Sequence, residues 1–408
     1  MQVKTRALLK IGLLTNLFEW YEFSIYGYLA GILGQLFFKT TQPVLALLLG
    51  FLPFTVSYLV RPAGSLILGL IGDQVSRQKA LNLSLFMMSV PTVVIGLLPT
   101  YDQIGNLAIV CLVLLRLIQG FGAGGEVPIS GCYIFENAEF NRKGLLGSTV
   151  NIGGILGFLT GSLASTLLIW FFDQKTIFNW AWRIPFLLGV PITAYIFYLR
   201  KSVFAISAPH TKSKNNMTHL FREHKANLLK VILISGFSAT CYYSLILWMP
   251  AYLTYFIGIP QKVASLMNTI IVCIMSLFWV VSGYLSDRVD YRKLVYCSVL
   301  AILFSAFPLF WTFRTQHYEL IMLGQCFYAL ILSGLDAPLV LYSGNSFPST
   351  IRALGMSLGM TLGATLGGMT PLICTWLIHQ TGLLTAPAFY IMAFGLLALP
   401  AALTLKKP

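Results

Sequence analysis

Long apolar runs alternate with short polar breaks along almost the whole chain. Each run has room for the roughly 20 apolar residues that a helix needs to cross a bilayer core. The breaks between the runs are charged or rich in Pro, Asn and Gly. The approximate limits of the predicted spans are 8–38, 43–71, 81–99, 105–135, 145–171, 182–200, 227–256, 264–286, 294–313, 318–347, 352–379 and 384–405. The pattern therefore predicts an all-α polytopic membrane protein with twelve transmembrane helices.

Composition supports this prediction and excludes an ordinary water-soluble domain. Apolar residues make up 57% of the 408 residues, charged residues only 10%, and the mean hydropathy is +0.78. A typical soluble domain carries about 25% charged residues. The formal charge of +14 would suggest a nucleic-acid partner in a soluble protein, so the placement of the basic residues has to be considered.

The basic residues follow the topology of the predicted spans. If the N-terminus is cytoplasmic, 20 of the 27 Lys and Arg residues lie on inner segments and 5 on outer ones, while Arg61 and Arg116 lie inside spans. The positive-inside rule then places both termini in the cytoplasm. We expect no nucleic-acid partner, because the charge is explained by topology.

The chain divides into two similar halves. The longest polar interruption follows the sixth span, which predicts a six-helix half over 1–200, a cytoplasmic linker over 201–226 and a second six-helix half over 227–408. Gly69, Asp73 and Lys79 recur 214 positions later as Gly, Asp and Lys. Such a repeat is typical of two halves related by an axis along the membrane normal, although any cytoplasmic turn can be rich in these residue types.

Few ionisable residues lie inside the predicted spans. A charge in a bilayer is costly and normally faces a protein interior, which makes each of them a functional candidate. They are Glu19, Glu22, Arg61, Arg116, Glu126 and Asp336.

The first span places two of these carboxylates on one helical face. Glu19, Glu22, Phe23 and Tyr26 follow the i, i+3, i+4, i+7 spacing. Burial and like charge both disfavour two neighbouring negative charges, so one of the two could exchange a proton near neutral pH. The alternative is that both carboxylates form fixed ion pairs with the Arg residues of other spans.

The fourth span carries a candidate anion site beside a Gly run. Arg116 and Gln119 share a face, and a guanidinium can bind a carboxylate through two hydrogen bonds. We therefore predict that Arg116 binds a substrate carboxylate. The Gly residues at 120, 122, 124 and 125 permit either close helix packing or a local break near Glu126.

The loop after the second span resembles the G-x-x-x-D-R-x-G-R-[RK] signature of the major facilitator superfamily. Gly69, Asp73 and Arg77 match it, whereas Gln74 and Ser76 replace the usual Arg and Gly. The resemblance implies that the signature, with its second copy at Asp287, Arg288 and Arg292, holds an inner gate closed. The alternative for Asp73 and Asp287 is simple helix capping.

Further motifs resemble the metabolite:proton symporters of that superfamily. They are Glu19–Phe23, Tyr26-Gly27, Arg61–Gly64, Arg116–Gly120, Gly124–Glu126 and Trp182–Phe186. The family includes proline/betaine, shikimate, oxoglutarate and citrate carriers, and usually has Asp where Glu22 stands. The resemblance implies alternating access around a central cavity formed mainly by spans one, four, seven and ten.

The second half supplies aromatic candidates and one carboxylate. Tyr242, Tyr243 and Trp248 resemble the aromatic pattern of the family's seventh span. Aromatic rings facing the Glu residues would suit a quaternary ammonium through cation–π attraction, which favours betaine or proline; ordinary helix packing is the alternative. Asp336 is either a second proton or cation site or a residue at a helix end that snorkels toward the membrane surface.

The candidate roles divide into three groups. We assign proton coupling to Glu19, Glu22 and Glu126. Substrate binding is assigned to Arg61, Arg116, Gln119, Phe23, Tyr26, Tyr242, Tyr243, Trp248 and Asp336, and gating to Gly69, Asp73, Arg77, Asp287, Arg288 and Arg292.

Together these patterns predict a transporter and not an enzyme. HExxH, G-x-S-x-G and GxxxxGK[ST] motifs do not occur, and the seven Cys form no CxxC pair, so we expect no metal site and no cofactor other than the proton as coupling ion. The predicted function is proton-coupled symport of a small zwitterionic or carboxylate metabolite, with an exchanger or a proton-driven efflux carrier as the alternative. We expect a monomer in a bacterial inner membrane, with the solute, protons and the lipid bilayer as partners.

Overall fold

The computed structural model describes residues 2–40, 42–137, 143–204, 217–286, 288–348 and 351–405, and within these ranges all regular structure is helical. Some predicted positions lie outside the described residues. They are Asp287 and the side chains of Asp73 and Arg77.

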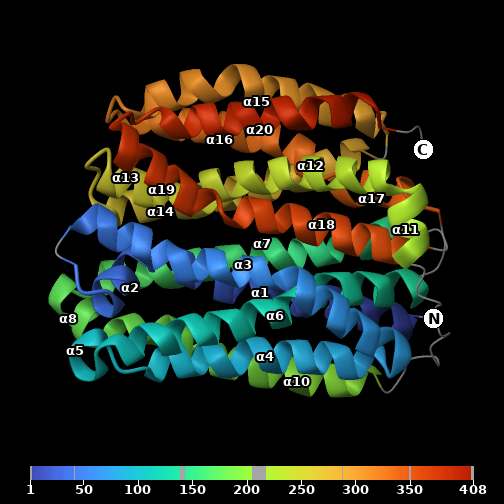
Figure 1. Cartoon of the computed structure of the whole chain (residues 1–408), viewed down its shortest axis with the longest axis horizontal. Helices are drawn as coiled ribbons and strands as arrows, with labels where there is room; N and C mark the ends of the chain where they lie inside the picture. Colours follow the sequence, from blue (N-terminus) through green and yellow to red (C-terminus); the bar gives the residue numbers. More distant parts are fainter. Residues whose placement is uncertain are drawn as a thin grey trace. The chain divides into compact units, whose positions relative to one another are not determined.

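The first half of the chain forms eleven helical segments within the described ranges (Figure 1). They are α1 (Gln2–Tyr28), α2 (Ala30–Phe37), α3 (Pro43–Gln74), α4 (Arg77–Leu97), α5 (Tyr101–Ile104), α6 (Asn106–Asn137), α7 (Lys143–Phe171), α8 (Gln174–Asn179), the 3₁₀ turn η2 (Ala181–Arg183), α9 (Ile184–Leu187) and α10 (Gly189–Phe204).

The second half begins with α11 (Met217–Glu223), which lies inside the predicted linker. The following segments are α12 (Lys225–Tyr242), the π-helical segment η3 (Tyr243–Trp248), α13 (Met249–Tyr255), α14 (Gln261–Ser286), α15 (Tyr291–Phe313), α16 (Tyr318–Asp336), α17 (Leu339–Asn345), α18 (Arg352–Gly368), α19 (Thr370–Thr381) and α20 (Ala386–Leu403).

The number of membrane-crossing helices agrees with the prediction. Eleven helices among the described residues are long and apolar enough to cross a membrane. The remaining predicted span is α1, which has 27 residues but is made more polar by Asn16, Glu19 and Glu22. Polar residues accumulated in one otherwise apolar helix are themselves a sign of function.

Several spans are interrupted where the sequence disfavours a regular helix. The tenth span divides into α16 and α17 at Ala337 and Pro338, because a Pro cannot donate the backbone hydrogen bond that a helix interior requires. The seventh span changes to the π-helical η3, and Pro250 then lies in the first turn of α13. π-helical turns are frequent at functional sites.

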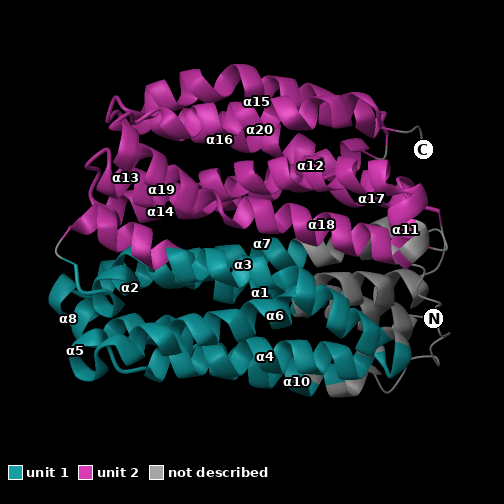
Figure 2. Ribbon diagram, in the orientation of Figure 1, with its two compact units in different colours: residues 1–41, 52–214 teal, residues 42–51, 215–408 magenta. Residues whose placement is uncertain are grey.

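The chain forms two compact units (Figure 2). One comprises 1–41 and 52–214, and the other 42–51 and 215–408. Within the first unit α1 packs on α7, α4 packs on α6, and α4 also packs on α10. Within the second unit the corresponding pairs are α12 with α18, α15 with α16, and α15 with α20. The same pairs of spans therefore meet in each unit, as expected of two structural repeats.

Candidate functional site

The side chains of α1 that the spacing placed on one face are all buried. Glu19, Glu22, Phe23 and Tyr26 have no exposed surface. The pairing of α1 with α7 is close because α7 carries Gly residues at the contact: a Cβ on Gly157 would lie 2.4 Å from the Leu17 carbonyl oxygen. The face of α1 that the spacing predicted therefore lies in the interior of the first unit.

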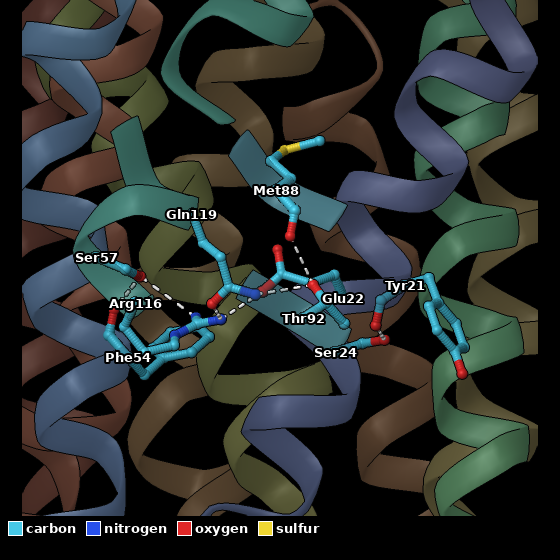
Figure 3. A network of polar contacts seen from close by, with 9 residues as sticks. All are labelled: Tyr21, Glu22, Ser24, Phe54, Ser57, Met88, Thr92, Arg116 and Gln119. Atoms are coloured by element: carbon cyan, nitrogen blue, oxygen red, sulfur yellow. Dashed lines mark hydrogen bonds and ion pairs between the residues drawn. The ribbon is translucent and has the colours of Figure 1, made fainter. Parts of the chain in front are cut away.

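An ion pair between Glu22 of α1 and Arg116 of α6 lies at the centre of a polar network (Figure 3). Arg116 Nη1 also donates to Gln119 Oε1 at 2.9 Å, and Arg116 Nη2 donates to Ser57 Oγ of α3 at 3.3 Å. Gln119 Nε2 in turn donates to Thr92 Oγ1 of α4 at 2.8 Å. Four spans therefore hold the guanidinium in one orientation.

One carboxylate oxygen of this network accepts no hydrogen bond within the described residues. Glu22 Oε2 is buried and has no hydrogen-bond partner among the described residues, and the same holds for the hydroxyl of Tyr26. Buried polar atoms in native proteins are normally paired, so each such atom needs an explanation. Both atoms belong to residues predicted to act in transport.

A second ion pair lies next to the first. Arg61 Nη1 of α3 is 3.1 Å from Glu19 Oε1, and both side chains are buried. The Arg61 guanidinium lies over two rings, 4.1 Å from the centroid of Phe23 and 4.1 Å from that of Tyr58. Two carboxylates and two guanidiniums are therefore enclosed by α1, α3 and α6.

Aromatic rings enclose Arg116 as well. Its guanidinium carbon lies 4.2 Å from the ring centroid of Tyr26, 4.8 Å from that of Phe23 and 5.7 Å from that of Phe54. Desolvated cation–π contacts contribute about 2 kcal/mol each in favourable cases. The predicted aromatic residues of α1 thus contact the Arg residues of the cluster.

The Gly run of α6 acts in close helix packing. A Cβ on Gly120 would lie 1.9 Å from the Ser57 carbonyl oxygen, and one on Gly124 would lie 2.0 Å from that of Arg61. Only Gly allows α6 and α3 to approach at these positions. The alternative of a break near Glu126 is wrong, because α6 continues from Asn106 to Asn137.

Glu126 belongs to a different cluster. It forms an ion pair with Arg200 at the end of α10, and Arg200 Nη1 also donates to the Leu81 carbonyl oxygen of α4 at 2.6 Å. Arg200 is buried. From the sequence, Arg200 is predicted only to be an inner positive charge. The carboxylate inside the fourth span requires a partner, which is the signal that points to Arg200.

The aromatic candidates of the second unit do not form one cluster, because Trp248 and Tyr242 contact different side chains. Trp248 is fully buried and donates from Nε1 to Thr375 Oγ1 of α19 at 2.9 Å. Tyr243 is buried, and Tyr242, which is partly exposed, stacks on Trp279 with ring centroids 6.2 Å apart. These contacts are those of packed helices, and a role in solute binding stays a prediction.

Asp336 ends α16 and is buried. The Ser238 hydroxyl of α12 donates a hydrogen bond to Asp336 Oδ1. Asp336 therefore lies at a helix end, but its side chain is buried and does not snorkel toward the surface. Sequence reasoning singled out Asp336 but not Ser238.

The predicted gating residues that the structure describes lie at the ends of helices. Arg288 lies over the Tyr284 ring at 4.3 Å, and Arg292 Nη2 lies 2.5 Å from Asp290 Oδ2. The hydrogen bonds from Arg292 lower the pKa of Asp290 to about 2. Gly69 lies in α3 with open space where a Cβ would stand.

Helix capping does not account for Asp73 in the way that the alternative supposed. Asp73 lies in the last turn of α3, not at a helix start. The cap of α4 is Ser76, whose side chain accepts from Lys79 N, and the cap of α15 is Asp290, which accepts from Arg292 N.

The structure thus brings together part of the predicted site. Glu19, Glu22, Phe23, Tyr26, Arg61, Arg116 and Gln119 form one cluster in the first unit. Within this cluster, sequence reasoning missed Phe54, Ser57, Tyr58 and Thr92, because single hydroxyl and aromatic residues in apolar helices carry no distinctive pattern. Among the described residues, no group of three or more His, Cys, Asp or Glu side chains could hold a metal ion.

Comparison with known proteins gives matches along nearly the whole chain. The glycine betaine/proline/ectoine/pipecolic acid transporter OusA of Dickeya dadantii is 30% identical over 97% of this chain and 82% of its own length. The ectoine/proline transporter ProP of Corynebacterium glutamicum is 34% identical over the same shares of the two chains. The proline/betaine transporter of Escherichia coli K12 is 29% identical over 99% of this chain and 84% of its own.

Solved structures show the same fold. The crystal structure of a D-xylose-proton symporter matches with a TM-score of 0.77 at 17% identity, covering 97% of this chain and 96% of that one. The inward-open xylose transporter XylE of E. coli matches with a TM-score of 0.74 at 16% identity, covering 98% and 95%. These neighbours confirm the predicted twelve-helix architecture.

A family model agrees with both comparisons. The model described as Major Facilitator Superfamily matches residues 12–315 and 231–408. The predictions of an integral membrane transporter, and of a chain that is not an enzyme, are confirmed by these matches. The chain belongs to the Major Facilitator Superfamily.

Proposed function

We propose that this transporter carries a small zwitterionic solute, with proline and betaine as the first choices, together with protons. The observation that carries the proposal is the fully buried Glu22–Arg116 ion pair, with Arg116 held in addition by Gln119 and Ser57. The relatives, which are named for transport of betaine, proline and ectoine, support the choice of solute.

The Glu22–Arg116 ion pair is better suited to exchanging partners during transport than to stabilising the fold. Removing two charges from water costs several kcal/mol per ion, and an apolar replacement is often as stable. A carboxylate that leaves its guanidinium must take a proton or find another cation, because an isolated buried charge is costlier still. Glu22 and Arg116 can separate cheaply only if Glu22 is protonated and another anion reaches Arg116.

This requirement couples the binding of the solute to the binding of a proton. A proton binds to the Glu22 carboxylate, the ion pair opens, and the solute carboxylate replaces it on Arg116. When the solute leaves, Arg116 again attracts an anionic Glu22, and the proton is released. Solute and proton therefore bind and leave together, which is symport.

The neighbouring charges favour a zwitterion over a dicarboxylate. Glu19 with Arg61 and Glu22 with Arg116 give two carboxylates and two guanidiniums, so the cluster is balanced. A zwitterion can place its carboxylate on Arg116 and its cationic group toward the Glu19 carboxylate, whereas a dicarboxylate would bring its second negative charge toward Glu19. We assign the cationic group of the solute to the side of Glu19, whose carboxylate can attract it.

The test is uptake by purified protein in liposomes. Betaine, proline, shikimate, oxoglutarate and citrate are screened with and without an inward proton gradient. Accumulation of proline or betaine only with the gradient supports the proposal. Counterflow of a solute with no accumulation under the inward gradient would support an exchanger. Accumulation driven by an outward proton gradient, with protons leaving as solute enters, would support a proton-driven efflux carrier.

We further propose that the protein lies in a bacterial inner membrane with both termini in the cytoplasm and acts as a monomer. The support is the excess of Lys and Arg on the predicted inner segments. A reporter fused to the C-terminus that is active only in the cytoplasm tests the orientation, and a periplasmic reporter that is active there contradicts it. Crosslinking in native membranes tests the oligomeric state.

A further inference from the structure

Asp336 differs from the buried carboxylates of the first unit in having no Arg beside it. Glu19, Glu22 and Glu126 each form an ion pair with an Arg side chain. The only hydrogen bond of Asp336 comes from the hydroxyl of Ser238, and no ion pair joins it to a basic residue of the described chain. Asp336 is 8% exposed.

The groups around Asp336 are neutral. The titratable groups within its electrostatic reach are the thiol of Cys241 on α12 and the hydroxyl of Tyr342 on α17. In the turn before Asp336, Ser282 of α14 pairs with Ser333 at 2.9 Å, and Ser298 of α15 lies against Gly334. No helix packed on this turn supplies a positive charge among the described residues.

One of these neighbours, Tyr342, has a hydroxyl that is unpaired among the described residues. The hydroxyl of Tyr342 is buried and has no hydrogen-bond partner, although Tyr342 is only 1% exposed. A protonated carboxyl group can both donate and accept a hydrogen bond, whereas an ionised one can only accept. The hydroxyl of Ser238, which contacts Asp336, can therefore donate to an ionised carboxylate and donate to or accept from a protonated one.

A row of polar side chains leads away from Asp336 between α12 and α16. The hydroxyls of Ser244 and Tyr328 are 3.3 Å apart, and Ser244 Oγ donates to the Cys241 carbonyl oxygen at 2.9 Å. Tyr328 also interacts with the Cys241 thiol. Ser244 belongs to the π-helical segment η3, where the regular backbone pattern is altered.

We propose that Asp336 is a second protonation site, located in the C-terminal unit, which binds a proton during each transport cycle. An ionised carboxylate buried without a positive partner costs far more than a neutral one, so the group must take a proton or a cation. A hard cation takes about six or more oxygen ligands, whereas within the described part of the chain this carboxylate has a hydrogen bond from the Ser238 hydroxyl alone. The proposal deepens the proposed proton coupling and rests on it for the transport step only.

The first experiment observes the proton directly and does not depend on transport. The infrared carbonyl band of protonated carboxylic acids is recorded on the full-length protein during a pH titration. Asp336→Asn should remove one component of this band, whereas Ser238→Ala should keep it at a shifted frequency, because the hydrogen bond from Ser238 is lost. An identical band in wild type and Asp336→Asn at every pH would overturn the proposal.

The second experiment connects the site to coupling. In liposomes, Asp336→Asn should keep gradient-independent counterflow of proline or betaine but lose accumulation driven by an inward proton gradient. The retained counterflow excludes a folding defect in Asp336→Asn, and Asp336→Glu, which keeps an ionisable group, should restore accumulation. Wild-type accumulation by Asp336→Asn would overturn the coupling role, whereas a wild-type protein that transports none of the solutes would contradict the proposed function and leave the infrared result valid.

Discussion

Glu22 and Arg116 form an ion pair between α1 and α6 in which neither side chain is exposed. The Arg116 guanidinium also donates to Gln119 from Nη1, the nitrogen that pairs with Glu22, and to Ser57 from Nη2. Glu22 Oε2, in contrast, has no hydrogen bond among the described residues. The acidic partner is thus held less firmly than the basic one. An exchange of partners on Arg116 therefore requires movement mainly of Glu22.

Replacing Arg116 by Lys should strongly reduce uptake. An ammonium keeps the charge but lacks the planar pair of donors that holds Gln119, Ser57 and a carboxylate together. Loss of one charge-assisted hydrogen bond costs about 1.5–3 kcal/mol, which corresponds to roughly 10-fold to 100-fold weaker solute affinity. Initial uptake rates as a function of solute concentration measure the effect. Arg222→Lys on the exposed α11 is the matched control, and normal affinity in Arg116→Lys would remove Arg116 from the site.

Replacing Glu22 by Gln should uncouple solute movement from the proton gradient. The amide resembles the protonated carboxyl group and cannot form an ion pair with Arg116, so the pair stays open. We expect counterflow to remain and gradient-driven accumulation to be lost, both measured in the same liposomes. Glu22→Asp, the residue usual in the related family, should retain accumulation. If Glu22→Gln accumulates solute as the wild type does, the proton is carried elsewhere.

The Glu126–Arg200 pair should contribute to stability more than to solute binding. Both side chains are buried, and removal of one partner leaves an uncompensated charge, which costs about 3–5 kcal/mol. Glu126→Gln and Arg200→Gln should each lower the melting temperature of the detergent-solubilised protein. The double variant should be more stable than the sum of the two single effects predicts, because no charge is left unpaired. Strict additivity would show that the two residues do not interact.

Close packing of α3 on α6 makes a further prediction. A Cβ on Gly124 would lie 2.0 Å from the Arg61 carbonyl oxygen, and a backbone atom cannot yield as a flexible side chain can. Gly124→Ala should therefore lower the melting temperature and displace Arg61 from Glu19. Gly283→Ala, where nothing lies within 4 Å, is the matched control and should leave the melting temperature nearly unchanged. Equal stability of the two variants would contradict the packing described for α6.

The fold could be predicted from sequence because the bilayer imposes simple rules. Apolar runs of the required length mark the spans, and the repeat of Gly69, Asp73 and Lys79 marks the two halves. Helix breaks were harder to predict: Pro338 interrupts the tenth span, whereas Pro53 and Pro62 lie within a continuous α3. A Pro is tolerated where neighbouring helices compensate the missing hydrogen bond, and this is a tertiary property.

The candidate site could be predicted only in part. Charged residues inside spans are rare, so Glu19, Glu22, Arg61 and Arg116 were found from composition alone. Which carboxylate pairs with which guanidinium depends on helix positions that no local pattern encodes. Arg200 was missed for the same reason, since its position at a span end is also that of an ordinary inner positive charge.

Replacing Asp73 by Asn should slow transport while solute affinity is preserved. Asp73 lies in the last turn of α3, where the helix dipole is negative, so the carboxylate opposes helix stability and needs another reason to be there. The superfamily signature indicates gating as that reason, and a gate changes the rate of interconversion between states, not contact with solute. Uptake kinetics should therefore show a reduced maximal rate at an unchanged half-saturating concentration. Ser76→Ala, which removes the cap of α4, controls for local helix stability. Lost affinity with an intact maximal rate in Asp73→Asn would contradict a gating role and place Asp73 in contact with the solute.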